Sequence, residues 1–242
     1  MTDYHIHFGQ FYECYYHAAD VLNTILEAGV DKCYYSSTSS CIENIWYSRV
    51  EREIENVVKD FSPAEMQPLL WYVPDYIHQE LRVEKAFAAL PYKGFKLHSG
   101  AHHWDLKNTQ QLDCLHSLFD FSDRFSLPVL IHTGENELEK PNYFERFFAE
   151  YQNADIILAH CRPVADTIRM FEKYPRVKGD TSFVSQENLA TLTNSGFASR
   201  LLFGTDFPIT HYFNSENKAY SLEELQKQYK RDIQQTKDKK WI

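Results

Sequence analysis

Residues 127–163 read LPVLIHTGENELEKPNYFERFFAEYQNADIILAHCRP. The stretch contains two short apolar runs, 127–132 and 154–160, and each run ends in a histidine. Between them lies a polar segment in which Pro141 stands where the first turn of a helix tolerates proline. Near-continuous apolar runs are typical of strands that are buried on both faces, as in parallel sheets covered by helices. The stretch therefore predicts a strand–helix–strand unit of a parallel α/β fold.

The same alternation of a short apolar run and a helical segment continues on both sides of this stretch. Eight candidate strands lie at residues 2–7, 30–36, 68–73, 93–98, 127–132, 154–160, 176–181 and 200–206. Candidate helices lie at residues 17–28, 41–60, 78–90, 108–124, 141–151, 163–173 and 185–196. A (β/α)8 TIM barrel typically needs about 250 residues. Eight strands in 242 residues therefore predict such a barrel.

The chain shows no linker or low-complexity tract, so we expect a single domain over residues 1–242. Within it, residues 221–242 form a predicted C-terminal helical segment. Residues 221–240 read as a charged helix, and Ser221 followed three residues later by Glu224 is typical of a capping box.

Composition excludes several classes of protein. The formal net charge of −9 argues against a general nucleic-acid or anionic-membrane binder, which normally carries a basic surface. No apolar run approaches the roughly 18 residues of a membrane span, and the first residues do not resemble a signal peptide. The five cysteines form no CxxC pair, which favours reduced thiols in a cytoplasmic protein. We expect a small-molecule substrate, and a homo-oligomer is compatible with the sequence.

Residues able to bind a metal stand at the ends of four predicted strands. The first strand ends in His5 and His7, which point to the same face because they are two residues apart. The fifth strand ends at His132, the sixth at His160 and the eighth at Asp206. Each alone could be structural. Because catalytic residues of a barrel lie at the carboxyl ends of its strands, the set together predicts a site for Zn²⁺, Mn²⁺ or Fe²⁺, with one or two ions.

Three further residues are candidates for binding the substrate. Lys96 and His98 form a polar pair at the end of the fourth predicted strand. The lysine could be carboxylated and bridge two metals, bind substrate or neutralise a buried carboxylate, and the histidine could bind substrate. Arg162 directly follows His160 and could pair with a carboxylate or phosphate, or could form a surface ion pair.

These residues carry a resemblance to a known family. His5-Ile6-His7, His132, His160 and Asp206, in this order, resemble the amidohydrolase superfamily. The segments GFKLH, LIHTGE, LAHCRP and FGTDFP are most similar to its amidohydrolase-2 branch. The resemblance implies a distorted barrel with a mononuclear or binuclear metal centre. It implies that His5, His7, His132 and Asp206 are ligands, and that His160 is a catalytic residue or a ligand of a second metal.

The predicted function is metal-dependent hydrolysis of a small-molecule amide, ester or lactone by a water that the metal activates. Asp206 is predicted to move the proton, and His160 to stabilise the oxyanion or bind a second metal. The resemblance also allows non-oxidative decarboxylation of an aromatic or unsaturated acid. A TatD-like nuclease is less favoured, because that branch usually has a glutamate on the fourth strand, which here reads KGFKLH. A metal-binding barrel without catalysis is the remaining alternative.

Overall fold

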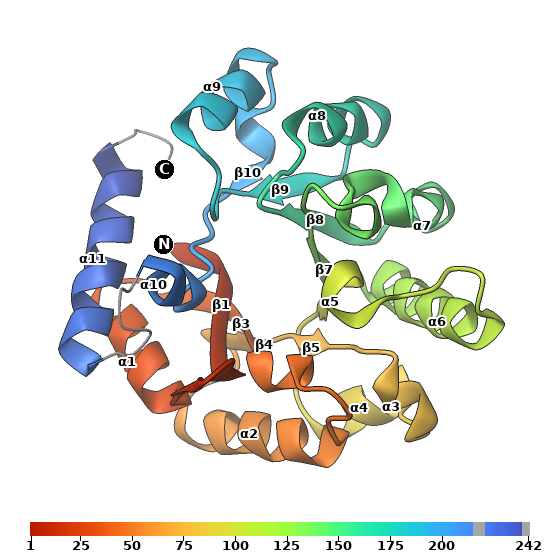
Figure 1. The fold of residues 1–242 in the computed structure, drawn as a ribbon, viewed down its shortest axis with the longest axis horizontal. Helices are drawn as coiled ribbons and strands as arrows, with labels where there is room; N and C mark the ends of the chain where they lie inside the picture. Colours follow the sequence, from red (N-terminus) through yellow and green to blue (C-terminus); the bar gives the residue numbers. More distant parts are fainter. Residues whose placement is uncertain (215–220, 239–242) are drawn as a thin grey trace.

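The computed structural model describes residues 1–214 and 221–238. Its strands are β1 (Thr2–Phe11), β2 (Cys14–Tyr16), β3 (Lys32–Ser37), β4 (Met66–Pro68), β5 (Leu70–Trp71), β6 (Phe95–Leu97), β7 (Pro128–His132), β8 (Asp155–Ala159), β9 (Lys178–Asp180) and β10 (Leu201–Leu202). All pairs are parallel except the hairpin of β1 with β2. The predicted barrel is confirmed, and Figure 1 shows its strands as a central ring.

The ring closes at two places where the regular sheets meet. The sheet orders are β2-β1-β3-β4 and β10-β9-β8-β7-β6-β5. β4 and β5 are two parts of one strand, interrupted at Leu69, whose amide donates to the carbonyl of Tyr35 at 2.7 Å. On the other side, β1 meets the segment that follows β10 through one parallel bridge between Ile6 and Phe207. This second junction brings the first and last predicted ligand segments together.

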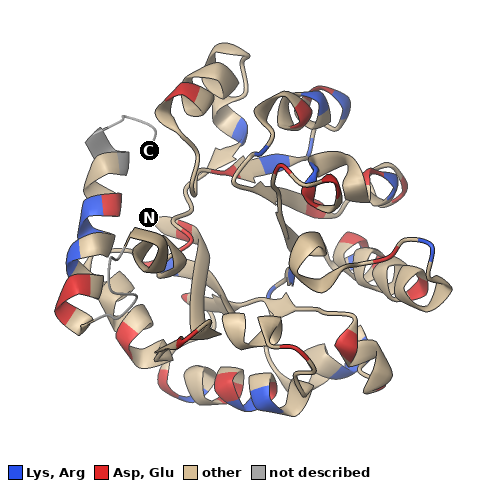
Figure 2. Cartoon of the chain, in the orientation of Figure 1, with Lys and Arg blue, Asp and Glu red and all other residues tan. Residues whose placement is uncertain are grey.

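Helices surround the strands. They are α1 (Ala18–Glu27), α2 (Tyr47–Asp60), α3 (Asp75–His78), α4 (Val83–Ala89), α5 (Ser99–His102), α6 (Thr109–Phe125), α7 (Glu145–Glu150), α8 (Val164–Lys173), α9 (Gln186–Asn194), α10 (Ile209–Asn214) and α11 (Leu222–Asp238). Figure 1 shows α11 beside α1 on the outside of the barrel. Charged residues of both signs are interspersed on these outer helices (Figure 2). No helix of the described residues is both long and apolar enough to cross a membrane.

A bulge in β1 sets the direction of the first ligand residues. Its register against β3 shifts between Asp3 and Ile6. Tyr4 packs against a small apolar cluster made by residues of other strands, while the next residue, His5, lines the cavity described below. Bulges commonly redirect a side chain next to a functional site. The bulge therefore allows Tyr4 to pack in the barrel interior while His5, the next residue, lines the cavity at the barrel mouth.

The predicted helix boundaries agree with the structure in most units. The capping box is confirmed, since the Glu224 amide donates to Ser221 Oγ at 3.2 Å and the Ser221 amide to the Glu224 carboxylate at 3.0 Å. The helix predicted at 41–60 begins only at Tyr47, because a 3-10 turn at Thr38–Cys41, a second turn with Asn44 in the left-handed region, and the extended residue Trp46 precede it. The helix predicted at 78–90 is divided into α3 and α4. Residues 239–240 of the predicted last helix lie outside the described residues.

Candidate metal centre

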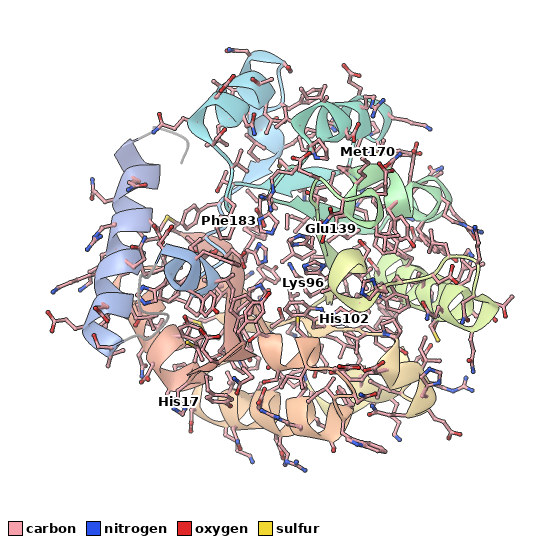
Figure 3. All side chains as sticks on the ribbon, in the orientation of Figure 1. His17, Lys96, His102, Glu139, Met170 and Phe183 are labelled. Carbon is pink, nitrogen blue, oxygen red and sulfur yellow. The ribbon has the colours of Figure 1, made fainter. Side chains whose placement is uncertain are left out.

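The carboxyl ends of the strands surround a cavity of about 760 Å³. Its wall includes each of the residues that the sequence predicts for the site, namely His5, His7, Lys96, His98, His132, His160, Arg162 and Asp206. Figure 3 shows Lys96, Glu139 and Phe183 around the centre of the barrel, whereas His17 and Met170 lie at the periphery. A cavity of this size is typical of small-molecule sites.

Three predicted ligands converge most closely. His7 Nε2 lies 3.0 Å from Asp206 Oδ1, and His5 Nε2 lies 3.4 Å from the same oxygen. All three side chains are buried, with residue exposures of 1% for His5, 3% for His7 and 6% for Asp206. One ligand atom from each lies within 4.8 Å of the others. The buried cluster is therefore consistent with a divalent metal site.

A hydrogen bond on the far side of the His5 ring fixes which of its nitrogens carries the proton. The Asp180 carboxylate can only accept, so His5 Nδ1 donates to its Oδ2 at 2.7 Å. His7 Nδ1 lies 3.3 Å from the carbonyl oxygen of Ser36 and 3.1 Å from Ser36 Oγ, so either tautomer of this ring finds a partner. His5 Nε2 is left with its lone pair on the side of Asp206. A divalent metal fits this set of imidazole and carboxylate ligands.

A buried lysine supplies positive charge at the same place. Lys96 Nζ lies 2.9 Å from His5 Nε2, and the side chain is 1% exposed. Burial lowers the pKa of Lys96 to about 8, although Asp206 and Asp180 oppose this shift. Burial lowers the pKa of His5 well below its ordinary value, and Lys96 adds to the effect. Burial alone would raise the pKa of Asp206, but attraction to His5 and the contact with His7 make the net shift downward.

His160 connects this cluster to His132. His160 Nε2 lies 3.9 Å from Asp206 Oδ2 and 3.1 Å from His132 Nδ1. Its Nδ1 lies 2.9 Å from Ser182 Oγ, which itself donates to Asp180 Oδ1 at 2.5 Å. Because that hydroxyl proton is engaged by a carboxylate, His160 Nδ1 is the donor to Ser182. His160 Nε2 therefore accepts from His132 Nδ1, so one hydrogen-bond chain links Asp180 to His132.

The backbone at two of these residues is strained. His160 has φ 68° and Asp206 has φ 55°, both in the left-handed region that residues other than glycine rarely adopt. Such conformations cost roughly 1–3 kcal/mol and persist where the surrounding structure enforces them, often at functional sites. Here they turn two strand-end side chains toward one point at the barrel mouth.

Comparison with known protein families identifies the family of this chain. A model of the amidohydrolase family, of the amidohydrolase-2 type, matches residues 45–238, which is most of the chain. The chain belongs to the amidohydrolase-2 family. No curated protein matches the sequence.

Solved structures share the fold of this amidohydrolase at low sequence identity. A probable 2-pyrone-4,6-dicarboxylic acid hydrolase from Acinetobacter baumannii with citric acid bound has TM-score 0.60 and 12% identity, over 100% of this chain and 95% of that one. Amidohydrolase 2 from Bifidobacterium longum subsp. infantis has TM-score 0.59 and 13% identity, over 87% and 85%. IDCase from Metarhizium anisopliae in its apo form has TM-score 0.52 and 12% identity, over 94% and 89%. At these identities, the likeness concerns the fold alone.

A second group of potential ligands in the amidohydrolase has unsuitable geometry. His98, His132 and Glu139 each offer an atom within 4.8 Å of the others. However, the rings of His98 and His132 are stacked, with centroids 3.7 Å apart and an interplanar angle of 9°. Imidazole lone pairs lie in the ring plane, so two parallel rings do not direct them at one ion. His98 Nδ1 also accepts from the Ala101 amide at 3.1 Å. We therefore assign no second metal to this group.

Glu139 was not singled out from the sequence, yet it lies at the site. Its Oε1 is 3.9 Å from His132 Nε2, and its Oε2 accepts from Asn136 Nδ2 at 3.1 Å. A Cβ atom added at Gly100 or Gly134 would collide with the Glu139 carboxylate. The two glycines thus provide the space in which the carboxylate approaches His132. In the sequence, the only sign that a side chain approaches here is Gly134 in the segment LIHTGE.

The remaining wall of the cavity combines one cation, Arg162, with the polar side chains of Gln10, Thr38 and Cys41 and with apolar side chains. Arg162 is partly buried, and its Nε has no hydrogen-bond partner among the described residues. The apolar side chains are Phe11, Tyr12, Ile42, Trp71, Phe183, Ile209 and Phe213. Most of these come from loops and from the short helix α10, which the strand pattern did not predict. The wall is therefore suited to a ligand with an anionic group and an apolar body.

Proposed function

We propose that this amidohydrolase is a metal-dependent hydrolase of a small-molecule amide, ester or lactone that also carries a carboxylate. The observation that carries the proposal is the convergence of the His5 and His7 imidazoles with the Asp206 carboxylate inside the cavity. His5, His7 and Asp206 would hold the metal, and His132 or His160 would complete the site. When bound, a divalent cation supplies a Lewis acid that polarises a carbonyl group and acidifies a water.

Two residues are proposed to handle protons and charge. Asp206 stays ionised because its pKa is lowered, so it is available to accept a proton from the attacking water and return it to the leaving group. His160 presents Nε2 as an acceptor in its neutral form. Stabilising an oxyanion therefore requires the protonated ring, whereas binding a second metal would use the lone pair. Oxyanion stabilisation and metal binding would both use His160 Nε2, which faces Asp206.

The substrate class follows from the rest of the wall. The unpartnered Nε of Arg162 is suited to a carboxylate, since guanidinium and carboxylate groups form charge-assisted hydrogen bonds. Lys96 provides a second positive group deeper in the cavity. The aromatic side chains of the wall would cover a planar or apolar body. A pyrone dicarboxylate is a reasonable first lactone to test, because one solved structure of this fold is named for that activity.

Non-oxidative decarboxylation is the second candidate, and Lys96 is the observation that favours it. Decarboxylation leaves a carbanion that must receive a proton. Lys96 is buried in the cavity, and its pKa of about 8 would let it donate a proton near neutral pH. The 5.5 Å approach of Lys96 Nζ to the ring of Trp71 places this donor beside an aromatic wall.

The two reactions are distinguished by their products. Protein reconstituted with Zn²⁺, Mn²⁺ or Fe²⁺ is assayed against lactones, small amides and 2-hydroxy aromatic acids, with chelator-treated protein and Asp206→Asn in parallel. We expect metal-dependent ring opening or amide cleavage. Release of CO₂ from the aromatic acids without hydrolysis would instead support the second candidate. Equal turnover by protein with and without metal would contradict both.

A further inference from the structure

The barrel closes at its metal centre, and the main-chain pairing there is sparse. β10 contains only two residues, and the segment after it meets β1 through the single bridge of Ile6 with Phe207. Two of the hydrogen bonds across this seam directly involve predicted ligands. The Asp206 amide donates to the His5 carbonyl, and the His7 amide donates to the Phe207 carbonyl, each at 2.8 Å. The distances from His5 and His7 to Asp206 therefore depend on the contacts that stabilise this junction between β1 and the segment after β10.

The carboxylate of Asp3 spans the seam. It is fully buried, with 0% of the residue exposed. Its Oδ1 accepts from the amide of His5 at 3.0 Å and from the amide of Thr205 at 3.2 Å. Its Oδ2 accepts from Thr205 Oγ1 at 2.8 Å. One side chain thus binds the backbone of a predicted ligand on β1 and the residue directly before Asp206.

A residue of α11 completes this arrangement. The hydroxyl of Tyr229 donates to Asp3 Oδ2 at 3.0 Å. Its ring packs against Phe207, the residue after Asp206, with centroids 4.7 Å apart. Tyr229 is 0% exposed. The last helix is therefore linked to both strand ends that carry the predicted ligands.

We infer that Asp3 and Tyr229 are positioning residues of the metal centre, through which α11 sets the distance from His5 and His7 to Asp206. The inference rests on the proposed metal site. It goes beyond it in assigning a role in metal affinity to a helix that contributes no ligand. Neither residue lines the cavity, so neither contacts substrate.

The hydrogen bonds of Asp3 and Tyr229 predict a different effect on metal affinity for each of three substitutions. Asp3→Ala removes the acceptor of both amides and both hydroxyls, and buried amides that lose their partner are costly. Asp3→Asn keeps an oxygen for the two amides, and its NH₂ can donate to the hydroxyls of Thr205 and Tyr229, which can reverse their direction. Tyr229→Phe removes one hydroxyl and keeps the ring against Phe207. Tyr72→Phe is the matched control, because Tyr72 is also buried and its hydroxyl donates to the Leu81 carbonyl away from the seam.

The experiment measures the dissociation constant for Zn²⁺ by competition with a chelator. The visible spectrum of the Co²⁺-loaded protein and the melting temperature of the metal-free protein are recorded in parallel. Substitutions of residues that hydrogen-bond to metal ligands typically weaken metal binding 10- to 100-fold. We expect about tenfold for Tyr229→Phe and about 100-fold for Asp3→Ala, with an altered Co²⁺ spectrum. Asp3→Asn and Tyr72→Phe should stay within about threefold of wild type.

The outcomes separate the inference from the proposed function. If the wild-type protein binds no metal, the metal site itself is wrong. If the wild type binds metal and Tyr229→Phe lowers only the melting temperature, with unchanged affinity and Co²⁺ spectrum, then Tyr229 is merely structural and the inference is overturned. Because Asp3→Ala can fail to fold, the comparison of Tyr229→Phe with Tyr72→Phe decides the matter.

Discussion

His5 Nδ1 lies 2.7 Å from Asp180 Oδ2, and this contact directs the other nitrogen of the ring at Asp206. Asp180 also accepts from the amides of His160 and Ser182, each at 3.0 Å, and from the Ser182 hydroxyl. Four donors therefore surround one carboxylate that is fully buried. Asp180, at the end of β9, thus orients the ring of the predicted ligand His5 directly and the ring of His160 through Ser182.

Asp180→Asn should weaken metal binding by about 10- to 100-fold. The donor that faces Asp180 Oδ2 is the ring N–H of His5, whereas the amides of His160 and Ser182 face Oδ1. An asparagine that keeps its oxygen for the two amides would present its NH₂ group to His5 Nδ1. This favours the tautomer with the proton on Nε2, the nitrogen that faces Asp206. Chelator competition measures the effect. Asp155→Asn, on the neighbouring strand and paired with Lys178, is the control and should bind metal as the wild type does.

Asp206→Asn should reduce turnover by at least about 100-fold and leave the fold intact. Asparagine has nearly the same shape and tolerates the left-handed backbone that residue 206 adopts. However, it can neither hold a proton from water nor contribute negative charge to the cluster. Steady-state kinetics and a circular dichroism spectrum test both parts. Turnover near the wild-type value would remove Asp206 from the mechanism.

Lys96→Met should change how the stability of the metal-free protein depends on pH. The pKa of Lys96 is lowered to about 8 in the folded protein from its ordinary value of 10.5. Between these values the unfolded chain binds more protons than the folded one, so stability rises as pH increases from about 8 to 10.5. Below pH 8 both states are protonated and the slope vanishes. Urea unfolding across this range should show stability of the wild type rising relative to that of Lys96→Met. The buried thiols, whose raised pKa values lower stability as pH increases, are common to both proteins and cancel in this comparison.

Arg162→Met should raise KM for a carboxylate substrate by about 10- to 100-fold with a smaller change in kcat, because a hydrogen bond to a charged group contributes about 1.5–3 kcal/mol. A neutral ester of the same substrate should be affected much less. Arg169→Met, at an exposed arginine of α8 paired with Asp166, serves as the control. Equal losses for the acid and its ester would show that Arg162 does not bind the carboxylate.

The barrel and the position of its site were predictable from the sequence because each depends on local patterns. Apolar runs such as 127–132 and 154–160 identify buried strands, and the topology of a barrel then brings their carboxyl ends together. His5, His7 and Asp206 could therefore be placed at one mouth without knowing any distance. The family match now covers residues 45–238, and the first strand with its two histidines lies before it.

Other features depend on long-range packing that no local pattern encodes. The sequence does not show that His132 stacks on His98, which fixes the plane in which the lone pair of His132 lies. Glu139 reaches the site only because Gly100 and Gly134 leave room for it. Likewise, the link from Tyr229 to Asp3 joins residues 226 positions apart. Such contacts determine the geometry of the site but not the class of fold.

The central claim is that the buried histidines of β1 and the carboxylate of Asp206 bind a divalent cation. Anomalous diffraction from crystals of metal-reconstituted protein, together with elemental analysis, tests it most directly. We predict at least one ion per chain, about 2.0–2.2 Å from His5 Nε2, His7 Nε2 and an Asp206 oxygen. Reconstituted protein without metal, or an ion bound only at other residues, would contradict the account.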